Sequence, residues 1–245
     1  MYLFEERLQE GVLLKRNSQF TMDVEVDGRT VKCHCPTTGR IGDIETKNIA
    51  CLISESSDPK RRLRYTVEAV SCDDLAETKK NWIGINQVLS NRLVEYFLEK
   101  HRMEDMVSGY DSIKREVKLG ISKLDLLVGS TYLEVKTPLT TLQVVYGKHI
   151  RTRKTAPFSS TERFVKHVNE LAGSLQEHER AILLTVRQYE VTAPKAHQKS
   201  THYEEVRRTM EEAVRKGLET WEANMRFSPE GVELLTYRNT TGQIL

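Results

Sequence analysis

The feature that most constrains this chain is an apolar stretch from Glu116 to Lys136 that charged residues interrupt. Its two parts, EVKLGISKLDLLV and TYLEVK, predict two short strands joined at Gly129-Ser130. Asp125 lies in the first strand, and Glu134 and Lys136 lie in the second. Side chains alternate along a strand, so Glu134 and Lys136 project from one face. If the strands pair, Asp125 lies beside Glu134, and two carboxylates and an ammonium share a small apolar volume.

Charges in such surroundings are costly to bury unless they are paired or bind a metal. One interpretation is therefore a structural ion-pair network. The other is a metal-dependent phosphodiesterase site, in which Asp125 and Glu134 bind Mg²⁺ or Mn²⁺ and the Val135 carbonyl adds a ligand. Lys136 would then position or deprotonate the attacking water, or stabilise the transition state. The spacing Asp-x8-Glu-x-Lys arises often by chance, so the pattern alone leaves both interpretations open.

Residues 1–80 predict an all-β region. Asp27-Gly28 separates two strand-like segments and is a strong hairpin signal. Several short apolar segments alternate with turns, which is typical of a small barrel such as an OB-like fold. The segments span residues 11–14, 20–26, 30–35, 50–54 and 64–70.

Residues 81–245 show a different hydrophobic period. Apolar residues recur at helical spacing in three segments, 86–100, 161–175 and 201–216. Strands are expected in the almost wholly apolar run 181–186, buried on both faces, and within 218–227 and 232–237. Residues 137–160 are too irregular to assign. The order of elements predicts an α/β (α+β) chain, with an OB-like barrel in residues 1–80 and a mixed-sheet domain in residues 81–245.

Composition indicates a folded cytoplasmic protein. Of the 245 residues, 38% are apolar and 29% are charged, which excludes a disordered chain. No apolar run approaches the roughly 18 residues of a membrane span, and the start lacks a signal-peptide pattern, so no membrane partner is expected. Cys33-His34-Cys35 resembles half a zinc site, but no second pair stands at a suitable spacing. Reduced, buried cysteines are the better interpretation.

Charge distribution is more informative than the net charge of +2. Basic residues gather in two stretches, which either contact phosphates or are simply solvated loops. The first contains Lys60, Arg61, Arg62 and Arg64, and the second contains Lys148, Arg151, Arg153, Lys154, Arg163 and Lys166. Arg40, at the exit of the Pro36–Gly39 turn, is a further candidate for nucleic-acid contact.

Other catalytic systems lack their motifs. The chain has no G-x-S-x-G elbow, P-loop, G-x-G-x-x-G or H-E-x-x-H sequence. Among the histidines, His149 and His167 flank the second basic stretch and are the two to follow. Glu95 lies beside the apolar stripe of the 86–100 helix, where it is either solvated or faces the site.

Short motifs along the whole chain resemble those of the sugar fermentation stimulation protein family (SfsA). They are Leu8-x-x-Gly11-x-Leu13-x-x-Arg16-Asn17-x-x-Phe20, His34-Cys35-Pro36-Thr37-Thr38-Gly39-Arg40, Gly84-Ile85-Asn86, Asn91-x-Leu93-Val94-Glu95, Glu116-Val117-Lys118-x-Gly120-x-Ser122, Asp125, Glu134-Val135-Lys136, Thr161-Glu162-Arg163 with Lys166-His167, and Arg180-Ala181. So many motifs in one order make a chance resemblance improbable.

The resemblance implies an N-terminal OB-like domain followed by a PD-(D/E)XK nuclease-like domain. It also implies DNA binding, a link to the regulation of sugar metabolism, and a role as a DNA/RNA nuclease. Carried over by position, Asp125, Glu134 and Lys136 form the nuclease-type core. Glu95 is then the helical acidic residue, and Ser122 lies beside the site.

Three positions depart from the family pattern. Thr37 and Lys123 stand where the family usually has Asn and Arg. Pro157-Phe158 stands where a Pro-Asp pair usually precedes Thr-Glu-Arg. If that Asp belongs to the site, its loss weakens the case for turnover.

Three functions follow from these observations. The first is a Mg²⁺- or Mn²⁺-dependent DNA/RNA nuclease that holds nucleic acid between the barrel and the α/β domain. The second is a DNA-binding regulator of sugar metabolism that keeps a nuclease scaffold without turnover. In the third, the charged core is only an ion-pair network.

Overall fold

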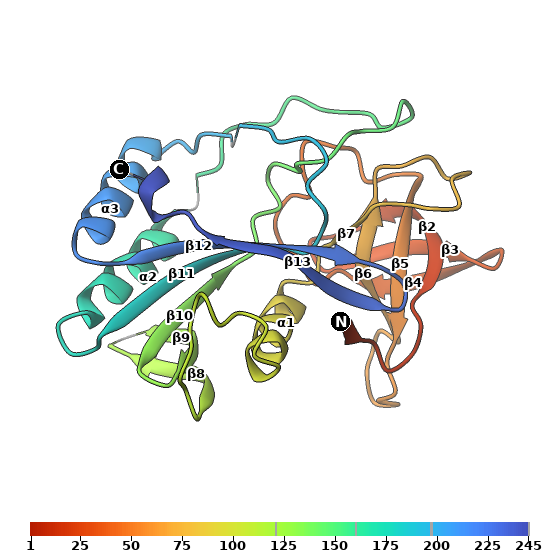
Figure 1. Ribbon diagram of the computed structural model, residues 1–245. Coiled ribbons are helices and arrows are strands. Elements are labelled where there is room, and N and C mark those ends of the chain that lie inside the picture. Colours follow the sequence, from red (N-terminus) through yellow and green to blue (C-terminus); the bar gives the residue numbers. More distant parts are fainter. Residues whose placement is uncertain (121, 160, 197, 245) are drawn as a thin grey trace.

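A closed barrel forms the N-terminal part of the computed structural model, which describes residues 1–120, 122–159, 161–196 and 198–244 (Figure 1). Neighbouring strands pair antiparallel, and the first and last close the barrel by pairing in parallel, Cys33 with Tyr65. The strands are β2 (Gln9–Arg16), β3 (Thr21–Val26), β4 (Arg29–His34), β5 (Ile49–Glu55) and β6 (Tyr65–Ser71), in the order β4-β3-β2-β5-β6. This five-stranded OB barrel confirms the predicted fold.

The hairpin between β3 and β4 shows how sequence determines this barrel. Asp27 and Gly28 have φ angles of 49° and 71°, the positive values that a two-residue type I′ turn requires. Val26 pairs with Arg29 across the turn. Alternate residues then point inward, and the four cysteines are buried and free, as expected. Burial raises the pKa of the Cys33 thiol to about 12, so it stays protonated.

The second part is a mixed sheet that continues from the barrel (Figure 1). The strands follow the order β7-β12-β11-β10-β9-β8. In addition, β13 pairs with the edge of β12 opposite to β11, and the short β1 (Tyr2–Leu3) pairs with β13. β10, β11 and β12 run parallel, and the other pairs are antiparallel. The strands are β7 (Trp82–Gly84), β8 (Ile113–Leu119), β9 (Ser122–Val128), β10 (Thr131–Lys136), β11 (Arg180–Arg187), β12 (Glu219–Phe227) and β13 (Gly231–Asn239).

Helices cover both faces of this sheet. The helix α1 (Gln87–Glu99) packs on one face, and α2 (Glu162–Ser174) and α3 (Tyr203–Arg215) pack on the other, followed after β13 by a 3₁₀ turn at Thr241–Gln243. In β11, Ile182 and Leu184 join the core under α1, whereas Ala181 and Leu183 join the core under α2. The run is therefore buried on both faces, as predicted. Among the helices of the described residues, none is long and apolar enough to cross a membrane.

The stretch from Glu116 to Val128 differs from its prediction. The sequence pattern predicts one strand before Gly129, but the structure divides this stretch between the end of β8 and all of β9. Gly120 has a φ of 56°, a left-handed conformation that ends β8, and Ile121 lies outside the described residues. β9 and β10 are joined at Gly129-Ser130, as predicted.

The irregular segment after β10 is fixed to the barrel by backbone contacts. Gly42 N donates to Leu139 O at 2.7 Å, and Arg153 N donates to Asp43 O at 2.7 Å. Leu139 also enters the core that fills the barrel. The predicted boundary between residues 80 and 81 falls just before β7, which pairs with β6 of the barrel and with β12 of the mixed sheet.

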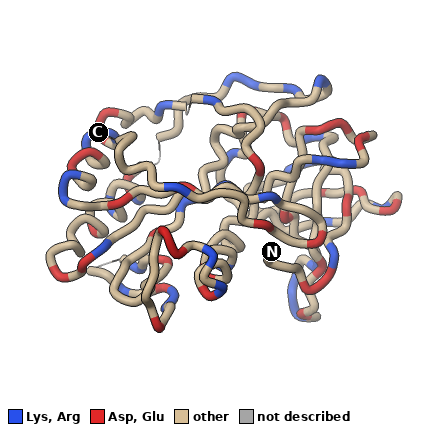
Figure 2. Tube along the Cα trace, in the orientation of Figure 1, with Lys and Arg blue, Asp and Glu red and all other residues tan. Residues whose placement is uncertain are grey.

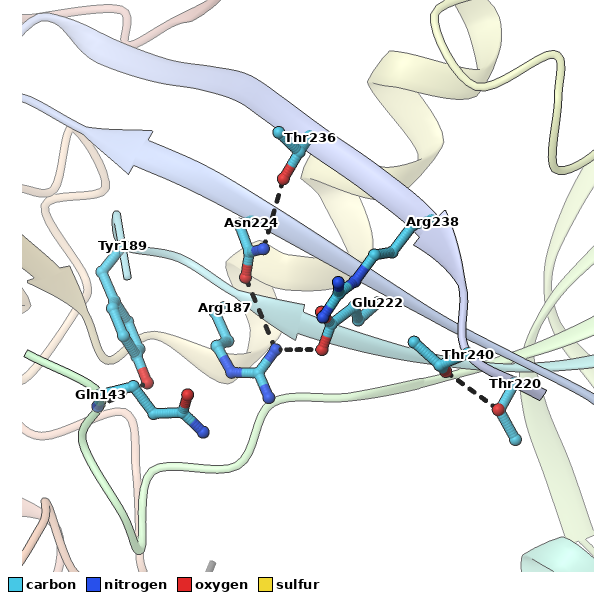
Figure 3. Close-up of polar contacts among 9 residues, drawn as sticks. All are labelled: Gln143, Arg187, Tyr189, Thr220, Glu222, Asn224, Thr236, Arg238 and Thr240. Carbon is cyan, nitrogen blue, oxygen red and sulfur yellow. Dashed lines mark hydrogen bonds and ion pairs between the residues drawn. The ribbon is translucent and has the colours of Figure 1, made fainter. Parts of the chain in front are cut away.

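A buried arginine fixes the sheet where it approaches the barrel (Figure 3). The Arg187 side chain is 7% exposed, and its Nη1 donates to Glu222 Oε2 at 2.7 Å. Arg238 Nε donates to the other oxygen of the same carboxylate at 2.7 Å. Burial acts to raise the pKa of Glu222, but the two arginines outweigh it and lower that pKa below its ordinary value. Glu222 is therefore ionised between two guanidinium groups.

Removing this carboxylate charge should destabilise the protein. Glu222→Gln keeps the shape but leaves Arg187 buried without a charged partner, and we expect the free energy of unfolding to fall by about 3 kcal/mol. Glu190→Gln, at the exposed Arg226 pair, is the matched control and should cost less than about 1 kcal/mol. Denaturant unfolding measures both values. Equal small losses would contradict a structural role for Glu222.

The same pair predicts a dependence of stability on pH. The folded pKa of Glu222 lies below the ordinary value of 4.5, so the unfolded chain binds more protons near that pH. The stabilisation is complete above pH 4.5 and is lost as the pH falls below it. Unfolding measured from about pH 6 down to about pH 3 should show a shallower acid slope for Glu222→Gln than for the parent protein. Parallel curves would refute the assignment.

Candidate functional site

The candidate site lies where β9 and β10 separate. The two strands pair only from Thr131 to Leu133 on β10. Beyond Leu133, side chains replace the sheet bonds: Val135 N donates to Asp125 Oδ2 at 2.8 Å, and Asp125 N donates to Glu134 Oε2 at 3.3 Å. The opening therefore holds two carboxyl groups next to each other, and the structure brings Asp125 and Glu134 together as the sequence predicts.

Asp125 also marks a change of face along β9. Leu126 belongs to the core under α1, whereas Leu124 belongs to the core under α2. Strict alternation would place these two side chains on the same face, so the strand turns at Asp125. The turn lets Asp125 Oδ1 accept a hydrogen bond from Asn91 Nδ2 of α1 at 2.7 Å while its backbone contacts Glu134.

Glu134 is held from the opposite face. Its side chain is 2% exposed, and its Oε1 lies 2.5 Å from Lys136 Nζ and 2.5 Å from His167 Nδ1 of α2. Burial acts to raise the pKa of Glu134, but Lys136 and His167 outweigh it and lower that pKa. Glu134 is therefore a buried, ionised carboxylate with two donors on one oxygen.

Asp125 shifts in the other direction. Burial raises the pKa of this carboxyl, and the negative charge of Glu134 raises it further. The hydrogen bonds from Val135 N and Asn91, and the charge of Lys136, offset part of this rise. Two adjacent carboxyl groups with opposite shifts are typical of functional sites, although structural ion pairs also produce them.

The donor atoms at this opening fit a small, hard cation. Asp125 and Glu134 offer carboxylate oxygens, and Mg²⁺ is usually bound by one or two carboxylates together with water and substrate phosphates. Within the described ranges, no group of three or more His, Cys, Asp or Glu side chains is placed to hold a metal. A cation here would therefore need the Val135 carbonyl, water or phosphate to complete its coordination.

The two remaining predicted catalytic residues lie nearby but apart from these contacts. Glu95 faces Arg115 of β8, with 3.5 Å between Glu95 Oε2 and Arg115 Nη1. It stands four residues after Asn91, about 6 Å further along the helix axis. Ser122 begins β9, and its buried Oγ has no hydrogen-bond partner in the described part of the chain.

Sequence reasoning assigned no role to two residues that contact the carboxyl groups. Asn91 stands in the same motif as Glu95, and the i, i+4 spacing that places both on one face of α1 was a usable signal. His167 was singled out only for flanking a basic stretch. Its contact with Glu134 depends on α2 packing across β10, which no local pattern reveals.

The basic residues divide into paired and unpaired groups. Arg40 donates to Ala156 O and Gln198 Oε1, Arg61 donates to Thr66 Oγ1, and Arg64 pairs with Glu55. Lys60 and Arg62 are exposed, and so are the members of the second stretch, which form no ion pair among the described residues: Lys148, Arg151, Arg153, Lys154, Arg163 and Lys166. Figure 2 shows blue along the segment between β10 and α2 that crosses the top of the molecule, and this segment carries the first four residues of the stretch; Arg163 and Lys166 lie in α2.

Known families match the chain over most of its length. The domain described as "Sugar fermentation stimulation protein RE domain" matches residues 88–231, and the "SfsA N-terminal OB domain" matches residues 14–85. Curated relatives, each described as a sugar fermentation stimulation protein homolog, cover almost the whole chain. The relative from Synechococcus sp. (strain JA-2-3B'a(2-13)) is 34% identical over 96% of this chain and 93% of its own. That from Shewanella frigidimarina is 32% identical over 93% and 94%.

A solved structure shares the fold. The structure of Pyrococcus furiosus SfsA in complex with Ca²⁺ superposes with a TM-score of 0.71 at 20% identity, over 98% of this chain and 97% of the other. At this identity the likeness concerns the fold alone. The two domain matches and the relatives above 30% identity confirm the resemblance predicted from the motifs. The chain belongs to the sugar fermentation stimulation protein family.

Proposed function

We propose that the protein is a metal-dependent nuclease that hydrolyses phosphodiester bonds in DNA or RNA. The observation that carries the proposal is the opening between β9 and β10, where Asp125 and Glu134 replace sheet hydrogen bonds. Two adjacent carboxylates repel each other, and this repulsion adds to the free-energy cost of burying them. A network that served only to pair charges would not need to place them next to each other. A shared cation would offset that repulsion.

Each residue at the opening would have a separate role in hydrolysis. Asp125 and Glu134 would hold Mg²⁺ or Mn²⁺, with the Val135 carbonyl as a further ligand. The bound cation would lower the pKa of water and neutralise charge on the scissile phosphate. Lys136 Nζ, on a side chain that is 28% exposed, would turn from Glu134 to the attacking water or to the phosphate. Asn91 orients Asp125 through the bond to Oδ1.

The second basic stretch supports nucleic acid as the substrate. Its first four members lie in the segment that connects β10, which ends at Lys136, to α2, and its last two, Arg163 and Lys166, lie in α2 itself. Both ends of this connecting segment therefore adjoin the carboxyl groups, because α2 also carries His167. The arginines and lysines of the stretch have no carboxylate partner among the described residues, which leaves them available to phosphates. Backbone contacts hold its middle against the barrel, and nucleic acid would lie between the barrel and the mixed sheet.

A non-catalytic role is the second candidate. Glu134 Oε1 already accepts two donors, a state that is complete without a cation. Phe158 stands where an acidic residue was expected from the family pattern. Under this alternative the protein is a DNA-binding regulator of sugar metabolism that retains the nuclease scaffold.

Removing either charge at the opening should abolish cleavage. Asp125→Asn and Lys136→Met are each expected to reduce Mn²⁺-dependent cleavage of DNA or RNA by at least about a hundredfold under conditions where circular dichroism shows each variant to be folded. Lys123→Met, at an exposed lysine of β9, is the matched control and should leave the rate unchanged. Cleavage that persists in both variants, or that survives a metal chelator, would refute the proposed roles.

Neutralising the basic stretch should weaken binding without affecting the carboxyl groups. The triple variant Arg151→Gln, Arg153→Gln and Lys154→Gln should reduce the slope of log affinity against log salt by up to about 2.7, or about 0.9 per lost phosphate contact. The same charge removed elsewhere, by Lys100→Gln, Arg102→Gln and Lys216→Gln, should change the slope little. Fluorescence anisotropy with labelled oligonucleotides measures both. Tight, salt-sensitive binding without cleavage under any metal would favour the regulator.

A further inference from the structure

We propose that His167 is a positioning residue that holds Glu134 in place while Lys136 is released to act. The proposal rests on the proposed function and assigns a role to a residue for which the motif comparison gave none. The geometry that carries it is the division of contacts between the two oxygens of Glu134. Oε1 accepts from both Lys136 and His167, whereas Oε2 faces the backbone of Asp125.

This division leaves Oε2 on the side of the second carboxyl group. A cation shared by Asp125 and Glu134 would use Oε2, because Oε1 accepts from two side-chain donors at 2.5 Å, whereas Oε2 accepts from Asp125 N at 3.3 Å. Rotation of the Glu134 carboxylate would exchange the two oxygens and break both contacts. Two donors on Oε1 therefore fix which oxygen faces Asp125.

The two donors differ in how firmly they are held. Lys136 has a flexible side chain that is 28% exposed, whereas the side chain of His167 in α2 is 7% exposed. The neighbouring Val168 and Leu171 are fully buried in the core under α2, which fixes the position of the helix. His167 is thus the rigid donor and Lys136 the mobile one.

The proposed reaction explains why two donors are present. Lys136 must leave Glu134 to contact water or phosphate, and without a second donor the buried carboxylate would lose its orientation at that moment. Nδ1 of His167 keeps its hydrogen bond to Oε1 throughout. Residues that orient metal ligands in this way typically contribute 10- to 100-fold to metal affinity or activity.

Three substitutions of His167 separate the role of the Nδ1 hydrogen bond from that of side-chain volume. The side-chain amide nitrogen of His167→Asn lies where Nδ1 was, so this variant retains the donor. The amide of His167→Gln reaches instead to the place of Nε2, and His167→Ala removes the ring. His178→Ala is the matched control, because His178 packs edge-on against Tyr132 nearby with 4.7 Å between ring centroids.

The readout is Mn²⁺ binding by titration calorimetry on the full chain, together with cleavage kinetics. We expect His167→Ala and His167→Gln to bind Mn²⁺ about 10- to 100-fold more weakly, and His167→Asn and His178→Ala to stay within about threefold of the parent protein. In cleavage, kcat should fall in the first two variants while KM for the oligonucleotide stays unchanged. A purely structural role would instead follow side-chain size and lower the unfolding temperature of all three His167 variants.

Two outcomes would overturn the inference and can be told apart. A parent protein that binds Mn²⁺ and cleaves, with His167→Gln and His167→Asn both equal to it, overturns the role of His167 alone. A parent protein that neither binds Mn²⁺ nor cleaves any substrate overturns the proposed function and the role of His167 with it.

Discussion

The end of sheet pairing at Leu133 is the constraint on which the rest of the site depends. Past this point β9 and β10 no longer share backbone hydrogen bonds, and Asp125 and Glu134 satisfy the freed groups. A buried backbone N–H without a partner costs as much as a lost hydrogen bond, so the carboxyl groups are held by the backbone itself. Asn91 from one face and His167 from the other then complete the arrangement.

The irregular segment between β10 and α2 begins and ends near this opening. The parallel strands β10, β11 and β12 form a rigid base, and the Arg187–Glu222 pair fixes the side of the sheet toward the barrel. The segment that carries Lys148 to Lys154 of the basic stretch leaves β10 after Lys136, crosses to the barrel and returns at α2. Loops positioned by a rigid scaffold often carry function, and here the loop begins and ends beside the two carboxyl groups.

Much of the fold followed from local patterns, and the failures have physical causes. The Asp27-Gly28 turn, the doubly buried 181–186 run and the helical stripe of α1 each depend on neighbours in sequence, and the structure contains all three. The division of Glu116–Val128 depended on the conformation of Gly120, which no periodicity encodes. The motif placed Asp125, Glu134 and Lys136 together, and the spacing of Asn91 and Glu95 offered a signal for Asn91. The role of His167 became visible only through the packing of α2 across β10.

The proposed function requires the opening between β9 and β10 to bind a cation between its two carboxyl groups. Anomalous diffraction from crystals soaked in Mn²⁺ tests this most directly. We expect one strong peak within about 2.0–2.4 Å of oxygens from both Asp125 and Glu134. The absence of a peak there at millimolar Mn²⁺, with Lys136 still in contact with Glu134, would contradict it and leave the charged core as an ion-pair network.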